Sequence, residues 1–118
     1  SNGPGVHWIV ALRLPNGEPY VYDPLGPQNN RIGSQMIPAD VFPNRAFGQK
    51  PHFYPYRSQL KSNSLCGWHA IYVANLISEG IQNGLTSPQE IDRLIESKFG
   101  RTADGGDVRL LESVFDEI

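Results

Sequence analysis

The first hydrophobic segment of the chain indicates a β-hairpin. Residues 6–14 (VHWIVALRL) are rich in β-branched and aromatic side chains, and the PNG sequence at 15–17 supplies turn chemistry before YVY at 20–22 resumes the extended pattern. Pro24 restricts the residue before it to extended geometry. We therefore expect Asp23 at the end of the second strand.

The middle of the chain predicts one more strand and little other regular structure. The sequence HFYPY at 52–56 is aromatic enough for a strand, but Pro55 has no N–H to donate. This strand should therefore lie at a sheet edge or stop at the proline. Residues 28–50 mix Asn, Gly and Pro with isolated apolar residues, and 38–46 allow at most a short helix.

Residues 65–100 predict two helices. Residues 65–78 (LCGWHAIYVANLIS) are apolar on most faces, which predicts a helix buried on several sides, with Asn63 or Ser64 as its N-cap. The sequence SPQE at 87–90 has capping-box spacing with proline at the first helical position, and Gly100 should end that helix. Its apolar residues recur at helical intervals: Ile91, Leu94, Ile95 and Phe99.

A last helix is predicted near the end of the chain, with Asp107 as its cap. Five apolar residues would form one stripe against the body of the domain: Val108, Leu111, Val114, Phe115 and Ile118. Together the elements predict a single α+β domain over residues 1–118. A small, mostly antiparallel sheet would pack against the buried helix, and two amphipathic helices would follow.

Composition and charge narrow the classes of function. The 118 residues are 39% hydrophobic and 19% charged, which fits one compact globular domain. No apolar run approaches the roughly 18 residues that a membrane span needs. The net charge is −2 and the basic residues are scattered rather than clustered. We expect neither a membrane nor a nucleic-acid partner.

The single cysteine is the residue with the most distinctive chemistry. Cys66 rules out an internal disulfide framework and a multi-cysteine zinc site, and it suits a reducing, intracellular compartment. We expect no metal and no cofactor. A lone cysteine that begins an apolar helix is more often a small core residue than a nucleophile. However, a thiol pKa of about 8.5 can fall to about 3.5–7.5 at a helix N-terminus.

The segment before the cysteine has a specific spacing. Gln59 stands seven positions before the pair Cys66-Gly67, and an Asn-Ser pair lies in the loop between them. Upstream, GVHW at 5–8 begins an apolar strand, and YDPLG at 22–26 follows the turn. In this combination the chain resembles the adenain-like cysteine proteases, whose clan also contains the ubiquitin-like-protein proteases. The match extends over residues 5–77.

The resemblance implies a thiol protease with a catalytic triad and an oxyanion donor. The implied site consists of the nucleophile Cys66, its base His7, the orienting acid Asp23 and the oxyanion donor Gln59. Trp8 and Gly67 are expected to border the substrate cleft, although a tryptophan in an apolar strand is more often a core residue.

Three features of the chain depart from the family pattern. Adenain has glutamate at the acid position, so Asp23 fits the wider clan better, and Leu25 replaces an aromatic residue. Family members have substantial sequence before the His-Trp strand, so we expect either that part of the substrate cleft is absent or that the chain is a compact relative cut from a polyprotein. The chain has no second cysteine and no basic stripe, so we expect neither an activating peptide nor DNA as cofactor.

We expect a cysteine endopeptidase that processes proteins of a virus or mobile element. The alternatives are an isopeptidase that removes ubiquitin-like modifiers, a cysteine-dependent acyltransferase, and an inactive binding module. A papain-like enzyme is disfavoured because its cysteine precedes its histidine, whereas here only His69 follows the cysteine, and we expect it to pack or hydrogen-bond locally. His52 is a weaker candidate base than His7, because no acid in a strand-end context follows it.

Overall fold

A three-stranded sheet forms one layer of the molecule. The computed structural model describes residues 8–26, 46–60 and 65–115. The strands are β1 (Val10–Arg13), β2 (Pro19–Tyr22) and β3 (His52–Phe53), in the order β1-β2-β3. The first pair is antiparallel and the second is parallel. The predicted α+β class and mostly antiparallel sheet are therefore confirmed.

The hairpin between β1 and β2 closes as the sequence predicted. Val10 pairs with Tyr22, and the Gly17 N–H donates to the Leu14 carbonyl at 2.8 Å. Gly17 has a φ of 92°, a conformation that glycine adopts without a steric cost. The strand β3 lies at the sheet edge and ends before Pro55, which confirms the expectation for that segment.

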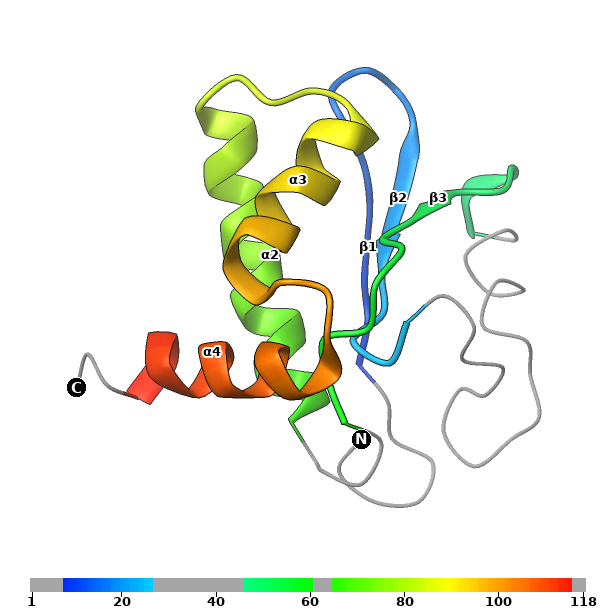
Figure 1. Cartoon of the computed structure of the whole chain (residues 1–118). Coiled ribbons are helices and arrows are strands. Elements are labelled where there is room, and N and C mark those ends of the chain that lie inside the picture. Colours follow the sequence, from blue (N-terminus) through cyan, green and yellow to red (C-terminus); the bar gives the residue numbers. More distant parts are fainter. Residues whose placement is uncertain (1–7, 27–45, 61–64, 116–118) are drawn as a thin grey trace.

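Three helices cover one side of the sheet (Figure 1). They are α2 (Cys66–Gln82), α3 (Pro88–Phe99) and α4 (Ala103–Phe115). The first two run beside the strands, and α4 crosses below them at the end of the sheet where β2 finishes (Figure 1). No helix in the described ranges is both long and apolar enough to cross a membrane.

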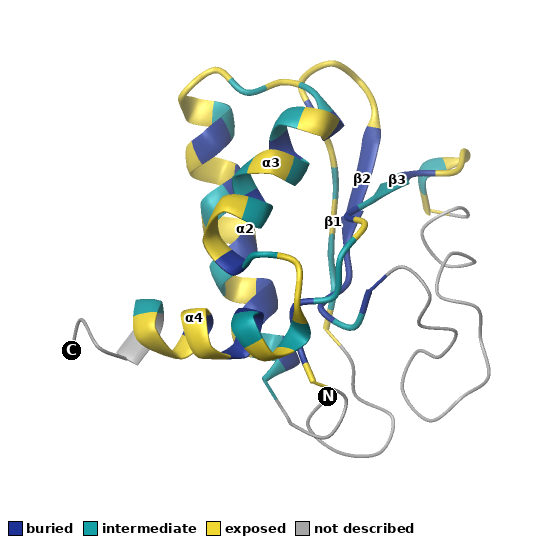
Figure 2. Ribbon diagram, in the orientation of Figure 1, coloured by how far each residue is buried: buried dark blue, intermediate teal, exposed yellow. Residues whose placement is uncertain are grey.

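The core lies between the central strand and the inner faces of the helices. All four residues of β2 are buried, as the dark strand in Figure 2 shows. The largest fully buried side chains come from the sheet side and from each helix: Tyr20, Tyr22, Tyr54, Ile77, Ile91, Ile95, Phe99 and Leu110. The tyrosine rings fill the space between the sheet and the helices and supply much of the apolar area in this core.

The prediction of a buried helix is confirmed for α2, but not for each of its apolar residues. Trp68 and Ile71 are exposed, whereas residues such as Val73 and Ile77 are buried. The predicted stripe of α4 is wrong: among the described apolar side chains of that helix Leu110 is buried, whereas Val108 is 54% exposed and Leu111 40% exposed. The side chains of residues 114 and 115, and residue 118, lie outside the described part of the chain. Neither described member of the predicted stripe is buried, and α4 instead turns Leu110 toward the body of the domain.

The helix ends agree with the sequence for α3 but not for the other two helices. The Ser87 hydroxyl and the Glu90 carboxylate form a reciprocal capping box, and Gly100 is the C-cap with a φ of 72°. The N-cap position of α2 is occupied by Leu65, so the prediction of Asn63 or Ser64 is wrong. Asp107 lies inside α4, which begins at Ala103, and therefore is not its cap.

Candidate active site

Cys66 is the first residue of α2 and is buried. The first N–H groups of a helix have no partner within the helix and carry partial positive charge, so they favour a thiolate. The sequence placed the cysteine at a helix start, and the structure agrees. Its expected base, His7, lies outside the described residues, and the catalytic roles stay a prediction.

The turn that carries Asp23 is bonded to the loop that carries Gln59. The N–H groups of Ser58 and Gln59 both donate to the Pro24 carbonyl, at 2.9 and 3.0 Å. These bonds join the end of β2 to the segment after β3, and both Asp23 and Gln59 are buried there. Two of the expected site residues, 36 positions apart in sequence, thus come from segments in direct contact.

Asp23 also has a structural role. Its Oδ1 accepts the Leu25 N–H at 2.9 Å, and the Gly26 N–H donates to the Asp23 carbonyl at 2.9 Å. The residue therefore builds the tight turn that the Asp-Pro sequence predicted. A carboxylate has two oxygens, so this turn and the orientation of a histidine are compatible roles.

The other side of the Gln59 loop is bonded to α4 and, through it, to α2. The Leu60 N–H donates to Asp107 Oδ2 at 3.0 Å, and His69 Nε2 lies 2.7 Å from Asp107 Oδ1. His69 follows Cys66 by three positions, which is close to one helical turn. In Figure 1 the end of β2, the segment after β3 and the start of α2 all lie at the end of the sheet next to α4.

The His69 ring is uncharged at pH 7, because burial disfavours its protonated form. Burial lowers its pKa, and the neighbouring Asp107 carboxylate opposes that shift only in part. Because an ionised carboxylate only accepts, Nε2 carries the proton and Nδ1 is left to accept from the Tyr22 hydroxyl, 3.4 Å away. Burial raises the pKa of Tyr22, so that hydroxyl keeps its proton.

Both ring nitrogens of His69 are thus engaged away from a proton-transfer role. His69 was expected to pack or to hydrogen-bond locally, and the packing is confirmed because the side chain is fully buried. Its partner Asp107 is 38 positions away, so this hydrogen bond is not a local one. Its ring also packs edge-on against Phe99, at 5.2 Å between centroids. His69 and Asp107 form a buried bridge between α2 and α4.

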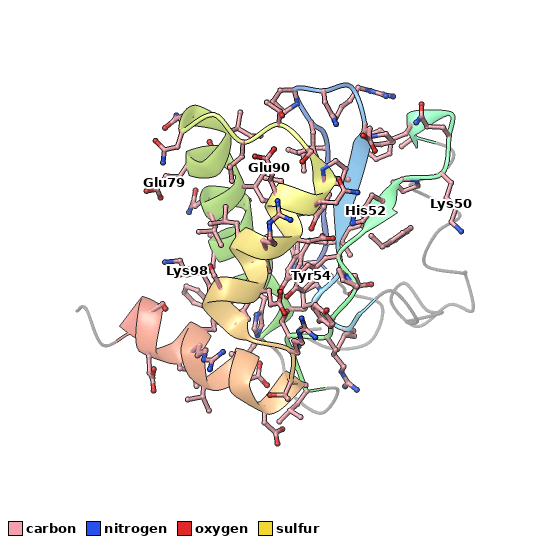
Figure 3. The ribbon with its side chains drawn as sticks, turned by 45° about the horizontal axis from the view of Figure 1, so that its top comes forward. Lys50, His52, Tyr54, Glu79, Glu90 and Lys98 are labelled. Carbon is pink, nitrogen blue, oxygen red and sulfur yellow. The ribbon has the colours of Figure 1, made fainter. Side chains whose placement is uncertain are left out.

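His52 belongs to a separate cluster beside the start of α3 (Figure 3). Its Nε2 lies 2.7 Å from Asp92 Oδ2, and the Tyr20 hydroxyl donates to Asp92 Oδ1 at 2.5 Å. The His52 ring also stacks on Tyr20, with 5.4 Å between centroids. Burial raises the pKa of Tyr20, which keeps this hydroxyl a donor. The cluster joins β3 to α3. The sequence contains no signal for Asp92 as the partner of His52, because Asp92 lies within a helix and not at the end of a strand.

A cleft of about 230 Å³ opens at the first turns of α2. It is lined by Trp8, Gly67, Trp68 and Ile71. Trp8 is 51% exposed, so the alternative of a core tryptophan is wrong. Trp68 is 47% and Ile71 is 61% exposed, which makes the cleft wall apolar and accessible. Trp8 and Gly67, which the resemblance assigned to a substrate cleft, therefore line the same cavity.

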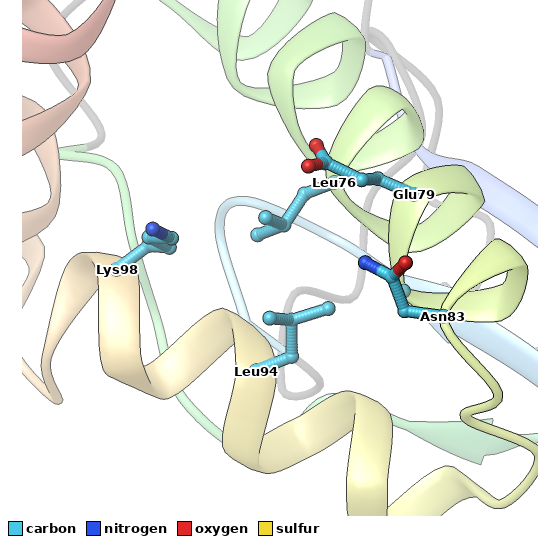
Figure 4. A pocket seen from close by; sticks show the side chains of 6 residues that line it. Leu76, Glu79, Asn83, Leu94 and Lys98 are labelled. Carbon is cyan, nitrogen blue, oxygen red and sulfur yellow. The ribbon is translucent and has the colours of Figure 1, made fainter.

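A second, smaller cavity of about 150 Å³ lies between α2 and α3 (Figure 4). Leu76, Glu79 and Asn83 face it from α2, and Leu94 and Lys98 face it from α3 (Figure 4). It is lined by no thiol or hydroxyl side chain and lies near the opposite end of α2 from Cys66. The described residues contain no group of three or more His, Cys, Asp or Glu side chains that could hold a metal ion.

Comparisons of the chain with known protein families, with curated proteins and with solved structures find no significant match. The interpretation of the site therefore depends on its residues and their contacts.

Proposed function

We propose that the protein is a cysteine endopeptidase with Cys66 as nucleophile. The observation that carries the proposal is the pair of hydrogen bonds from Ser58 and Gln59 to the Pro24 carbonyl. They join the expected oxyanion donor to the turn of the expected acid. The same loop is linked through Asp107 and His69 to the helix that Cys66 begins.

In the proposed mechanism, His7 takes the Cys66 proton and the thiolate attacks a peptide carbonyl. Asp23 fixes the tautomer of the imidazole and stabilises its charged form. The Gln59 amide and the Cys66 backbone N–H hold the oxyanion of the tetrahedral intermediate. The amine leaves with the proton from His7, and water hydrolyses the thioester to release the acid and restore the thiol.

The proposed substrate is a protein segment, processed from the proteins of a virus or mobile element. The cleft of about 230 Å³ at Gly67 is smaller than the usual range of ligand pockets, and its walls are apolar. A cleft of this size suits an extended main chain with one apolar side chain beside the thiol. Gly67, next to Cys66 in the sequence, adds no side chain to the wall of this cleft.

A second candidate is an inactive binding module that uses the same cleft. It is favoured by one observation, the 0% exposure of Cys66. A substrate carbonyl must contact the sulfur, so catalysis requires the residues around Cys66 to open. A module that only binds an apolar segment through Trp68 and Ile71 has no such requirement.

The test compares wild-type protein with Cys66→Ala on two sets of reagents. One set is a panel of ubiquitin and ubiquitin-like activity probes, and the other is a peptide library derived from viral polyproteins. Turnover of peptides by wild type alone supports the endopeptidase, and labelling by the modifier probes alone indicates an isopeptidase. Peptide binding by both proteins, without turnover or labelling, would establish the binding module.

Thiol reactivity provides an independent measurement. Iodoacetamide should alkylate Cys66 faster than a cysteine in an unstructured peptide at pH 7, because the helix start favours the thiolate. His52→Ala is a suitable control, since its contacts lie in the Asp92 cluster. Alkylation of folded wild-type protein at the peptide rate or slower would count against an activated nucleophile.

A further inference from the structure

The two residues that flank Gln59 are both held by consecutive residues of α4. The Leu60 N–H donates to Asp107 Oδ2 at 3.0 Å. On the other flank, the Ser58 carbonyl lies so close to Gly106 that a β-carbon there would be 2.2 Å from its oxygen. The Gln59 loop is therefore held between the Pro24 turn on one side and α4 on the other.

Asp107 is itself held by His69. The Asp107 Oδ1 to His69 Nε2 distance is 2.7 Å, and the side chains are 9% and 0% exposed. A hydrogen bond to a charged group at such a site is stronger than one in water, because little solvent competes for the partners. One carboxylate oxygen of Asp107 is therefore bonded to the helix that Cys66 begins, and the other is bonded to the loop that contains Gln59.

We infer that Asp107 and His69 are positioning residues that set the place of Gln59 relative to Cys66 in the transition state. The inference rests on the proposed function, because it gives Gln59 its oxyanion role. An oxyanion donor acts only when it lies about 2.7–3.1 Å from the developing charge. A displacement of about 1 Å can cost about 10²-fold in rate. A carboxylate that joins the loop to the helix prevents such a displacement.

The molecule contains a matched control for this bridge. His52 and Asp92 also form a histidine–aspartate pair at 2.7 Å, and it joins β3 to α3. None of the hydrogen bonds described for that pair involves the 58–60 segment or α2. Loss of Asp92 should therefore reduce stability without a specific effect on the transition state.

The experiment measures kcat, KM and the iodoacetamide alkylation rate for wild type, Asp107→Ala, Asp107→Asn and Asp92→Ala, using the best peptide from the library. Asp107→Ala should lower kcat about 10- to 100-fold, with KM and alkylation within about threefold. Asp107→Asn should recover most of the loss, because its amide oxygen can still accept the Leu60 N–H. Asp92→Ala should stay within about threefold of wild-type kcat.

A double mutant separates positioning from a general structural effect. If Asp107 acts through Gln59, then Gln59→Ala combined with Asp107→Ala should be no slower than Gln59→Ala alone. Losses that multiply would overturn the inference. So would a kcat for Asp107→Ala equal to that of Asp92→Ala while Gln59→Ala is strongly impaired, and that result would leave the proposed function intact.

Amide hydrogen exchange tests the bridge without any substrate. Asp107→Ala should raise the exchange rate of the Leu60 amide, whereas Asp92→Ala should leave it unchanged. If Asp107→Ala does not fold, His69→Leu is the second variant, because it fills much of the space of the ring but removes the donor to Asp107 Oδ1. It should lower kcat in the same direction with KM nearly unchanged, and a wild-type kcat in folded His69→Leu would overturn the inference. An unaltered Leu60 exchange rate in folded Asp107→Ala overturns the inference. A wild type that turns over no peptide overturns the proposed function, and the inference with it.

Discussion

The backbone of Gly106 lies against the carbonyl of Ser58. An added β-carbon at position 106 would stand 2.2 Å from the Ser58 oxygen and 2.8 Å from its carbonyl carbon. Both are backbone atoms, so no side-chain rotation can relieve the clash. This contact lets α4 approach the segment that carries the expected oxyanion donor.

Gly106→Ala should therefore displace the 58–60 segment. We expect a loss of about 1–3 kcal/mol in the free energy of unfolding, as for other overpacked sites, together with lower kcat. The control is Gly105→Ala, whose β-carbon would meet the Thr102 hydroxyl at 2.8 Å. Rotation of this hydroxyl would lose the hydrogen bond that it accepts from the Gly105 N–H, but alanine favours a helix over glycine by about 1 kcal/mol, so this variant should stay within about 1 kcal/mol of wild type. Urea denaturation measures the free energy of unfolding of both variants. Equal losses would show that a β-carbon is no less tolerated at position 106 than at position 105.

Gln59→Ala tests the oxyanion donor. It should reduce kcat by about 10²–10³ while KM and Cys66 alkylation stay nearly unchanged, because the amide acts mainly in the transition state. Gln59→Glu should do no better, since a carboxylate repels the oxyanion. Gln89→Ala, at an exposed position of α3, is the matched control. Full activity of Gln59→Ala against a confirmed substrate would remove Gln59 from the mechanism.

Asp23→Asn separates the turn from the triad. The Asn Oδ1 can still accept the Leu25 N–H, so helix content and thermal stability should be preserved. Turnover should fall by at least about tenfold, because an amide cannot stabilise a charged imidazole as a carboxylate does. Asp104→Asn, on the exposed side of α4, controls for loss of charge. Unchanged turnover would limit Asp23 to building the turn.

Trp68→Ala tests the cleft at the start of α2. Loss of apolar wall area should raise KM by about tenfold, which corresponds to about 1.4 kcal/mol of binding. Alkylation of Cys66 by iodoacetamide should not slow, because that reagent is too small to need the wall. Val108→Ala removes a comparably exposed side chain from α4 and serves as control. A KM that responds equally to both variants would place substrate elsewhere.

His69 should make stability depend on pH. Burial lowers the pKa of folded His69 below its ordinary value of 6.5, with Asp107 opposing and Tyr22 bonded to the other nitrogen. Between these two pKa values the unfolded chain binds more protons, so the free energy of unfolding falls as pH drops below 6.5. The contribution is fully present above that pH.

Urea denaturation between about pH 5 and pH 8 measures this dependence, in a range where most carboxylates stay ionised. His69→Gln should flatten the decline below pH 6.5, because a glutamine does not titrate. His52→Gln retains His69 and should retain its part of the decline. An unaltered pH profile in His69→Gln would show that the buried histidine is not its source.

The sequence alone predicted the turns and helix ends that depend on residues close together in the chain. The turn at 15–17, the capping box at Ser87 and the stop at Gly100 each depend on residues within a few positions. The cysteine at a helix start and the Asp-Pro turn are of the same kind. The spacing of Gln59 and Cys66 supports the resemblance that implies the candidate site, because both residues lie within one short segment.

The tertiary structure alone decided which faces of the helices are covered and which distant groups meet. The apolar pattern predicted Val108 and Leu111 on the covered face of α4, but both are exposed, and Leu110 is the buried apolar residue beside the close contact of Gly106 with Ser58. Asp107 has the local signature of a helix cap, yet it bonds to His69 and to the Leu60 N–H. Its partners lie 38 and 47 positions away. Apolar periodicity carries no information on such pairings, because it records that a side chain avoids water and not what it will contact.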